Sequence, residues 1–246
     1  MDHLIYTAMS GASAAAQRQS VLANNLANAS TQGFRAELST FRAVPLRGDG
    51  ATTRVFAMEA TSGHDEKPGA IQRTGRELDL AARGNGWFAV QGLDGTEAYT
   101  RAGAFQISSQ GTLVTSSGLV VLSDGGSPID VPPGAEITIA SDGTLTAKSG
   151  NAPASTLGRI KLATPGADDP LKRSEDALFR TASQEPLPAD PAGRLESGAL
   201  EGSNVNPIET MVGMIAAARQ FDSQMRLLQT AESSDKSAAQ LLAMQG

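Results

Sequence analysis

The chain has 246 residues, a net charge of −6 from 20 basic and 26 acidic side chains, and 4% aromatic residues. Its negative charge argues against binding to the phosphate backbone of nucleic acids, and so few aromatic rings offer little surface for stacking bases. Because it contains no cysteine, the chain has neither disulfides nor thiolate metal sites.

The first twenty residues have neither a basic region nor the continuous apolar run of a cleavable signal peptide. No stretch approaches the roughly 20 apolar residues that a membrane span requires. We therefore expect no cleaved signal and no membrane segment, which leaves open export by a route that reads an uncleaved terminus.

A first helix is predicted for residues 3 to about 28. Apolar side chains recur there at steps of three and four residues, at Ile5, Ala8, Ala12, Ala15, Leu22 and Leu26. Between His3 and Phe34 the only charged side chain is Arg18, whereas a helix with a solvated face normally carries several charges. We therefore expect neighbours to cover this helix on more than one side. The alternative is a buried helix of a monomeric domain.

The end of this helix is rich in uncharged hydrogen-bonding groups. Asn24, Asn25 and Asn28 fall within five positions, and Gly33 then precedes the aromatic Phe34. Amide side chains supply both donors and acceptors without the desolvation cost of a charge. Residues 43–69, which follow, fit no regular period and are predicted to be an extended connection.

From about residue 70 to 200 the apolar period changes to two, which is typical of half-buried strands. The segment EITIASDGTLTAK is the clearest hairpin, and an antiparallel β domain is predicted with Trp87, Phe88 and Phe105 in its core. Residues 164–195, rich in proline and charge, are predicted to be irregular with at most short strands. Pairs able to supply the positive φ of tight turns stand at Asn85-Gly86, Asp94-Gly95, Gln110-Gly111, Asp124-Gly125 and Asp142-Gly143.

A second long helix is predicted near the C-terminus. Asn206 is placed as its N-cap, Pro207 suits its first turn, and Glu209 complements its positive end. Its apolar stripe contains Ile208, Met211, Ile215, Ala218, Phe221, Met225 and Leu228. Two such stripes at opposite chain ends favour pairing of the terminal helices as a coiled coil.

Catalytic chemistry is not indicated. Neither histidine has the local spacing of a metal site, and adjacency of Ser62, His64 and Asp65 in one loop does not imply the convergence that a triad needs. Ser233 and Lys236 match S-x-x-K without the partner motifs of that enzyme class. We expect no catalytic, cofactor or metal site, no small-molecule substrate and no enzyme.

Three blocks of the sequence, in family order, resemble the bacterial flagellar rod and hook proteins. The N-terminal block is NNLANASTQGFRAELSTF and the central one begins GNGWFAVQGLDGTEAYTRAGAF. The C-terminal block is LEGSNVNPIETMVGMIAAARQFDSQMRLLQTAESSDKSAAQLL. The opening MDHLIYTAMSGA, the phrase FRAVP and the modest length are most similar to the proximal rod members. Phe221 departs from the pattern, which has tyrosine there.

This resemblance implies a structural subunit of the proximal flagellar rod, the driveshaft that transmits motor torque. It would leave the cytoplasm through the flagellar type III export apparatus, without signal cleavage, and assemble in the periplasm with copies of itself and other rod subunits. The fold class is then α+β, with segments 1–33 and 204–246 as the inner rod core, 34–69 as a joining segment and 70–203 as an outward β domain.

The asparagines would bond to the last helix carbonyls and to neighbouring subunits, Gly33 would permit a left-handed turn, and Phe34 would anchor it. A polar cap within one subunit is the alternative for each asparagine. The implied assembly interface comprises Ile5, Ala8, Ala12, Ala15, Leu22, Asn24, Asn25, Leu26, Asn28, Gly33, Phe34, Asn204, Asn206, Ile208, Met211, Ile215, Ala218, Phe221, Met225 and Leu228. Other readings left open are a distal rod or hook member of the family, or a β-rich binding or adhesive protein that oligomerises through its terminal helices.

Overall fold

A computed structural model describes residues 2–45, 55–150 and 153–243 of the chain. The chain divides into two compact units. We call the first the helical unit; it consists of Met1–Ala27, Glu37–Gly63 and Val205–Gly246. We call the second the β unit; it consists of Asn28–Ala36 and His64–Asn204. The fold is α+β, as predicted.

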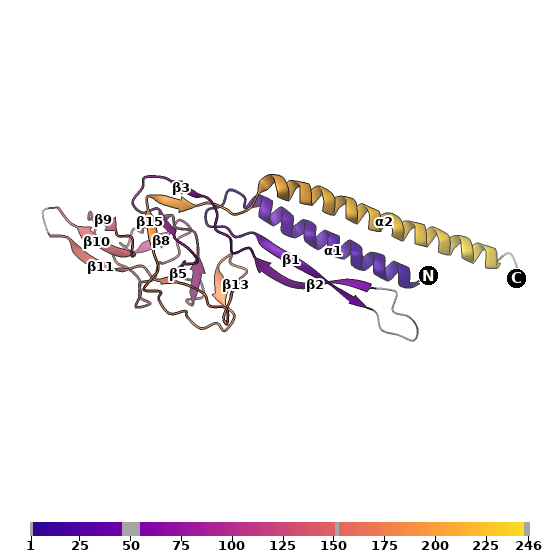
Figure 1. The fold of residues 1–246 in the computed structure, drawn as a ribbon, viewed down its shortest axis with the longest axis horizontal. Coiled ribbons are helices and arrows are strands. Elements are labelled where there is room, and N and C mark those ends of the chain that lie inside the picture. The colour runs from indigo at the N-terminus through magenta and orange to yellow at the C-terminus, as the bar shows by residue number, and fades with distance from the viewer. Residues whose placement is uncertain (1, 46–54, 151–152, 244–246) are drawn as a thin grey trace. The chain divides into compact units, whose positions relative to one another are not determined.

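The helical unit is built on α1 (Asp2–Ala27) and α2 (Pro207–Ala243), whose ranges agree with the predicted helices. The two helices lie side by side (Figure 1) and contact each other, although their sequences stand at opposite ends of the chain. The predicted N-cap is confirmed, because the Asn206 side-chain oxygen accepts the backbone N–H groups of Ile208 at 3.1 Å and Glu209 at 3.4 Å.

The helical unit also contains a hairpin where the sequence predicted an extended connection. β1 (Glu37–Pro45) and β2 (Val55–His64) pair as a two-stranded sheet, and β1 contacts α1. The extended backbone was predicted correctly, but its pairing was not, because few apolar residues alternate along these strands. Residues 46–54 of the predicted joining segment lie outside the described residues.

Among the residues that the structure describes, the β unit contains fourteen short strands. They are β3 (Ile71–Arg73), β4 (Leu80–Ala82), β5 (Trp87–Gln91), β6 (Glu97–Thr100), β7 (Phe105–Ile107), β8 (Leu113–Thr115), β9 (Glu136–Ile139), β10 (Thr144–Lys148), β11 (Ser155–Arg159), β12 (Leu162–Ala163), β13 (Leu171–Arg173), β14 (Phe179–Thr181), β15 (Leu195–Ser197) and β16 (Ala199–Glu201). The named pairings of the β unit are antiparallel.

A five-stranded sheet in the order β12-β5-β6-β14-β13 organises this unit. Successive side chains of β5 point to opposite faces, so Phe88 joins the larger apolar cluster while Trp87 joins the smaller one. Trp87, Phe88 and Phe105 are at most 4% exposed, which confirms the predicted core. Apolar clusters on both faces of this sheet give the β unit a hydrophobic core of its own.

The predicted hairpin EITIASDGTLTAK is β9 and β10, in which Leu145 pairs with Ile139 across an Asp142-Gly143 turn. Between residues 164 and 195 the structure has only the short strands β13, β14 and the start of β15, in agreement with the sequence.

Three of the five predicted turn glycines have positive φ, namely Gly95, Gly111 and Gly143. In the other two turns the left-handed residue is Gly84 rather than Gly86, and Gly126 rather than Gly125. Where two glycines stand close together, either one can take that conformation.

Candidate assembly site

Two of the three N-terminal asparagines join α1 to β1 within the helical unit. The Asn25 side chain is 6% exposed and bonds to both backbone groups of Glu37. It donates to the Glu37 carbonyl at 2.9 Å and accepts the Glu37 N–H at 2.8 Å. Asn24 donates to the Glu37 carboxylate at 3.0 Å. Glu37 is a partner that the sequence did not indicate.

The next turn belongs to the β unit. The Asn28 carbonyl accepts the Thr31 N–H, and its side-chain oxygen accepts the Thr31 hydroxyl, both at 3.1 Å. Gly33 has a φ of +67°, the left-handed conformation expected from the sequence. Its N–H donates to the Glu201 carbonyl at 2.8 Å. A Cβ at Gly33 would lie 2.3 Å from the carbonyl carbon of Arg101, so the site requires glycine for space as well as for conformation.

Phe34 is 7% exposed and is anchored in the β unit. The guanidinium of Arg173 lies over its ring, 4.6 Å from the centroid. This distance is typical of a cation–π contact. The Phe34 N–H donates to the Thr31 carbonyl at 3.3 Å, so the turn and its anchor are one bonded segment.

A buried ion triad lies next to this turn. The Glu201 carboxylate, 2% exposed, accepts from Arg35 Nη1 at 2.7 Å and from Arg101 Nε at 2.8 Å. The Gly69 N–H donates to the same carboxylate at 2.9 Å. Arg101 and Gly69 stand 100 and 132 positions from Glu201 in the sequence, and no local sequence pattern predicts such partners.

The triad holds two positive charges against one negative charge. Arg101 directs further N–H groups at the carbonyls of Gly84 and Gly86, and burial lowers its pKa against the opposing effect of Glu201. Both guanidiniums also lie over the Trp87 ring, with Arg35 at 5.9 Å and Arg101 at 5.8 Å. Carbonyl dipoles and an aromatic face therefore help to stabilise the second positive charge.

Asn204 completes what we call the junction, defined as residues 33–36, 64–69 and 199–204. Its side-chain oxygen accepts the Ala36 N–H at 2.7 Å. Its amide nitrogen donates to the carbonyls of Asp65 at 3.0 Å and Lys67 at 2.9 Å. One side chain thus joins three segments that are far apart in the sequence.

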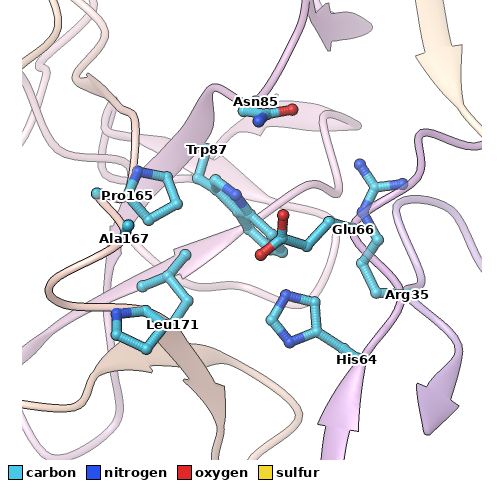
Figure 2. Close-up of a pocket in the computed structure, with 10 residues that line it drawn as sticks. Arg35, His64, Glu66, Asn85, Trp87, Pro165, Ala167 and Leu171 are labelled. Atoms are coloured by element: carbon cyan, nitrogen blue, oxygen red, sulfur yellow. The ribbon is translucent and has the colours of Figure 1, made fainter.

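A cavity of about 340 Å³ lies against the junction (Figure 2). Arg35, His64, Glu66 and Asn85 line one side of it, and Pro165, Ala167 and Leu171 line the other, with Trp87 between them. The ring of His64 packs edge-on against Phe179 at 4.8 Å and against Trp87 at 5.9 Å. Burial lowers the pKa of His64, while the nearby Glu66 opposes that shift. None of the described residues lining this cavity carries a hydroxyl, thiol or amine that could act as a nucleophile.

The described residues contain no group of three or more histidine, cysteine or carboxylate side chains placed to hold a metal ion. Within residues 2–45, 55–150 and 153–243, no helix has the length and apolar character needed to cross a bilayer.

The side chains of the predicted apolar stripe of α1 differ in how deeply they are buried. Ala8, Ala12 and Ala15 are buried, and their small side chains allow close helix packing. Ile5, Leu22 and Leu26 are half-buried. Leu22 lies near Gly213 of α2, where an added Cβ would meet its side chain at 3.3 Å.

The predicted stripe of α2 divides between two faces. Ala218, Phe221 and Leu228 are half-buried, whereas Ile208, Met211, Ile215 and Met225 are exposed. Among the α2 positions whose burial is described, the buried ones are instead Thr210, Ala217 and Ala231. In the sequence, the spacing of small residues is what indicates this packing face of α2. The larger apolar residues of the helix led the prediction to a different face.

Comparison with known proteins agrees with this architecture. Residues 5–35 match the family described as flagella basal body rod protein, residues 81–147 match the flagellar hook protein FlgE/F/G D1 domain, and residues 196–241 match the flagellar basal body rod FlgEFG protein C-terminal family. The chain is 46% identical to the flagellar basal-body rod protein FlgF of Salmonella typhimurium, over 99% of this chain and 100% of the relative. It has the same identity and coverage with FlgF of Escherichia coli. It is 33% identical to FlgG of Bacillus subtilis, over 93% of this chain and 94% of the relative.

Terminal helices that contact each other, a separate antiparallel β unit between them in the sequence, and these matches together define a structural protein of the bacterial flagellum. The chain belongs to the flagellar basal-body rod protein family, and it is a structural subunit of the proximal rod. The family is not enzymatic. The family resemblance seen in the sequence is thereby confirmed.

Proposed function

We propose that this subunit polymerises through its terminal helices, paired as a coiled coil, and so forms the inner wall of a rod that transmits motor torque. One observation carries the proposal. Large apolar side chains are exposed on the helices of the single chain, namely Tyr6 (59%), Met9 (54%), Ile208 (76%), Met211 (50%), Val212 (62%), Ile215 (56%), Met225 (38%) and Leu227 (49%). Exposed apolar patches of this kind mark protein–protein contacts.

The coiled-coil arrangement is supported by the spacing of buried alanines on α1. Ala8, Ala12 and Ala15 follow steps of four and three residues, the spacing of a seam between supercoiled helices. In the proposal, segments 1–33 and 204–246 form the inner core of the rod, 34–69 joins them to the outside, and 70–203 is the outward β domain. The exposed face of α2 then meets other subunits.

We assign the predicted interface residues two kinds of role. Asn25, Gly33, Phe34 and Asn204 stabilise the chain around the junction and the end of α1, as their contacts within one subunit support. Asn24 and Asn28 are only half-buried and contribute to subunit contacts in addition. The exposed residues of α2 and their neighbours on α1 provide the main contact area.

The proposed partners are copies of this chain and other rod subunits, with the flagellar type III export apparatus as the carrier. The subunit crosses to the periplasm without cleavage of a signal peptide and joins the growing rod there. Family membership supports this route, and the exposed helical faces described above support the assembly step alone.

A charge placed on the exposed helix face tests the proposal. Ile215→Glu should leave the monomer folded, because the side chain is already 56% exposed, but should remove the subunit from the rod since a buried interface disfavours an unpaired charge. Gln220→Glu, at an exposed polar position of the same helix, is the matched control. The readout is the amount of each variant in purified basal bodies relative to total cellular protein, with motility in soft agar. Incorporation of Ile215→Glu at the wild-type level would refute assembly through this face.

A further inference from the structure

The β unit has a second cavity, of about 590 Å³, whose lining includes Asn28, Gly33 and Phe34 of the predicted interface. Its apolar lining includes Phe34, Leu178 and Phe179, each of which is at most 7% exposed. Leu93 stands on its rim with 90% of its surface exposed. Such an exposed leucine beside an apolar hollow favours a protein partner that covers both.

The cavity carries positive charge that the described part of the chain compensates only in part, because Arg35 pairs with Glu201 at 2.7 Å whereas Arg173 has no such partner. Arg35 and Arg173 both line it, and the buried atoms Arg35 Nε and Arg173 Nη1 have no hydrogen-bond partner among the described residues. No salt bridge joins Arg173 to a carboxylate in the described part of the chain. Asp176 also lines the cavity, but Arg180 holds its carboxylate at 3.0 and 2.8 Å. The cavity therefore suits an apolar partner that brings one carboxylate.

The first turn of α2 has this chemistry. Ile208, Met211 and Val212 are 50% exposed or more, and Glu209 between them is exposed as well. Glu209 is the only charged residue from Val205 to Ala218, so no base within one helical turn compensates it. Two other carboxylates of α2 have such neighbours: Glu232 pairs with Lys236 at 2.7 Å, and Asp222 stands between Arg219 and Arg226 in the sequence.

We propose that the 590 Å³ cavity of one subunit receives the first turn of α2, residues 208–212, from a second copy of the chain. Glu209 pairs there with Arg173, and the apolar side chains around Glu209 cover Phe34, Phe179 and Leu93. The contact is head-to-tail, because the two surfaces differ, and a contact of this kind extends into an open helical assembly. This inference rests on the proposed assembly through the terminal helices, and it adds a specific site and its complement.

Cysteine pairing tests the contact directly, because the chain has no cysteine of its own. Cells co-express one chain with Ser117→Cys, an exposed position lining the cavity, and another with Met211→Cys. Since each chain has one thiol, any disulfide between the two is intermolecular. We expect an oxidant to give a heterodimer linked through positions 117 and 211 in purified basal bodies. A chain with Thr138→Cys, exposed on β9 and not among the cavity residues, is the matched control and should give none with Met211→Cys.

A reciprocal charge exchange tests the ion pair. Arg173→Glu and Glu209→Arg should each reduce incorporation into basal bodies by about tenfold, the effect of losing a contact of moderate strength. The double variant should recover most of the loss. Lys172→Glu is the control, because Lys172 is an exposed neighbour on β13 that does not line the cavity. Trp87 fluorescence melts establish that Arg173→Glu and Lys172→Glu are folded, and circular dichroism does so for Glu209→Arg, because Trp87 lies in the β unit.

The outcomes separate this contact from the wider proposal. Normal incorporation of both single variants, or a Met211→Cys disulfide that forms only with a different rod protein, would overturn the pairing of 208–212 with the cavity while the subunit remained in the rod. Absence of the wild-type chain from basal bodies would instead refute the proposed function itself.

Discussion

At the scale of single residues, Gly33 shows how one position can be fixed by two independent constraints. It has positive φ, and its missing Cβ leaves room for the Arg101 backbone. Gly33→Ala should lower the free energy of unfolding of the β unit by more than the roughly 1–2 kcal/mol of left-handed strain alone. Urea denaturation followed by Trp87 fluorescence measures this, since Trp87 is the only tryptophan. Gly118→Ala, where φ is +85° and nothing lies within 4 Å, isolates the strain; equal losses in both variants would contradict the steric requirement.

Glu201 gives a second prediction at this scale. Glu201→Gln removes the only carboxylate from the triad and leaves Arg35 and Arg101 buried without their counterion. Breaking a buried ion pair from one side costs about 3–5 kcal/mol. Glu196→Gln is the matched control, because its partner Arg83 is largely exposed and such surface pairs contribute about 0–1 kcal/mol. The same denaturation experiment compares them, and a small loss for Glu201→Gln would show that the triad is not a stabilising feature.

His64 should make the β unit sensitive to acid. Burial in the folded chain lowers the pKa of His64 below its ordinary value of 6.5. The unfolded chain therefore binds the proton more readily than the folded chain. As a result, the free energy of unfolding falls as pH drops below about 6.5. Asp65 and Glu66 reduce this shift, while Arg35 and Arg173 increase it. We expect the Tm of wild type to fall more between about pH 7.5 and pH 5.5 than the Tm of His64→Gln. Parallel pH dependence of the two proteins would show that His64 does not contribute.

At the scale of elements, close packing of α1 depends on its small residues. Ala12→Leu enlarges a side chain at a buried position, and overpacking of this kind costs about 1–3 kcal/mol. We expect normal expression but a lower helix melting temperature by circular dichroism and a lower yield of rods. Ala16→Leu makes the same change at an exposed position one turn further along α1 and should behave like wild type. Equal behaviour of the two variants would argue against close contact at Ala12.

The sequence predicted elements well where the signal was local. The cap at Asn206, the turn at Gly33 and the β9–β10 hairpin follow from patterns within a few residues. It did not predict the β1–β2 pairing or the triad, because Arg35 and Glu201 stand far apart in the sequence and only the folded chain brings them together. The exposed and buried faces of α2 were also not separated, since an apolar period shows that a face exists but not which neighbour covers it.

At the scale of the whole molecule, we expect the two units to differ in stability before assembly. The β unit has its own core, whereas the terminal helices expose large apolar side chains. Hydrogen exchange of the monomer should therefore be slow in β4, β5 and β6 and faster in α1 and α2. The protected unit should include residues 28–36, because Gly33 and Arg35 bond to Glu201. Strong protection of both helices in dilute solution would show that they form a stable pair without neighbours.

The division of the chain into units has a mechanical consequence. The backbone passes between the helical unit and the β unit four times, after residues 27, 36, 63 and 204. If a single backbone segment connected the units, rotation about one of its bonds would let one unit rotate freely relative to the other. With four connections, continued rotation in one direction would wind the connecting segments around one another, and a twisting load is divided among them. Cleavage of any one peptide bond would still leave the units covalently joined.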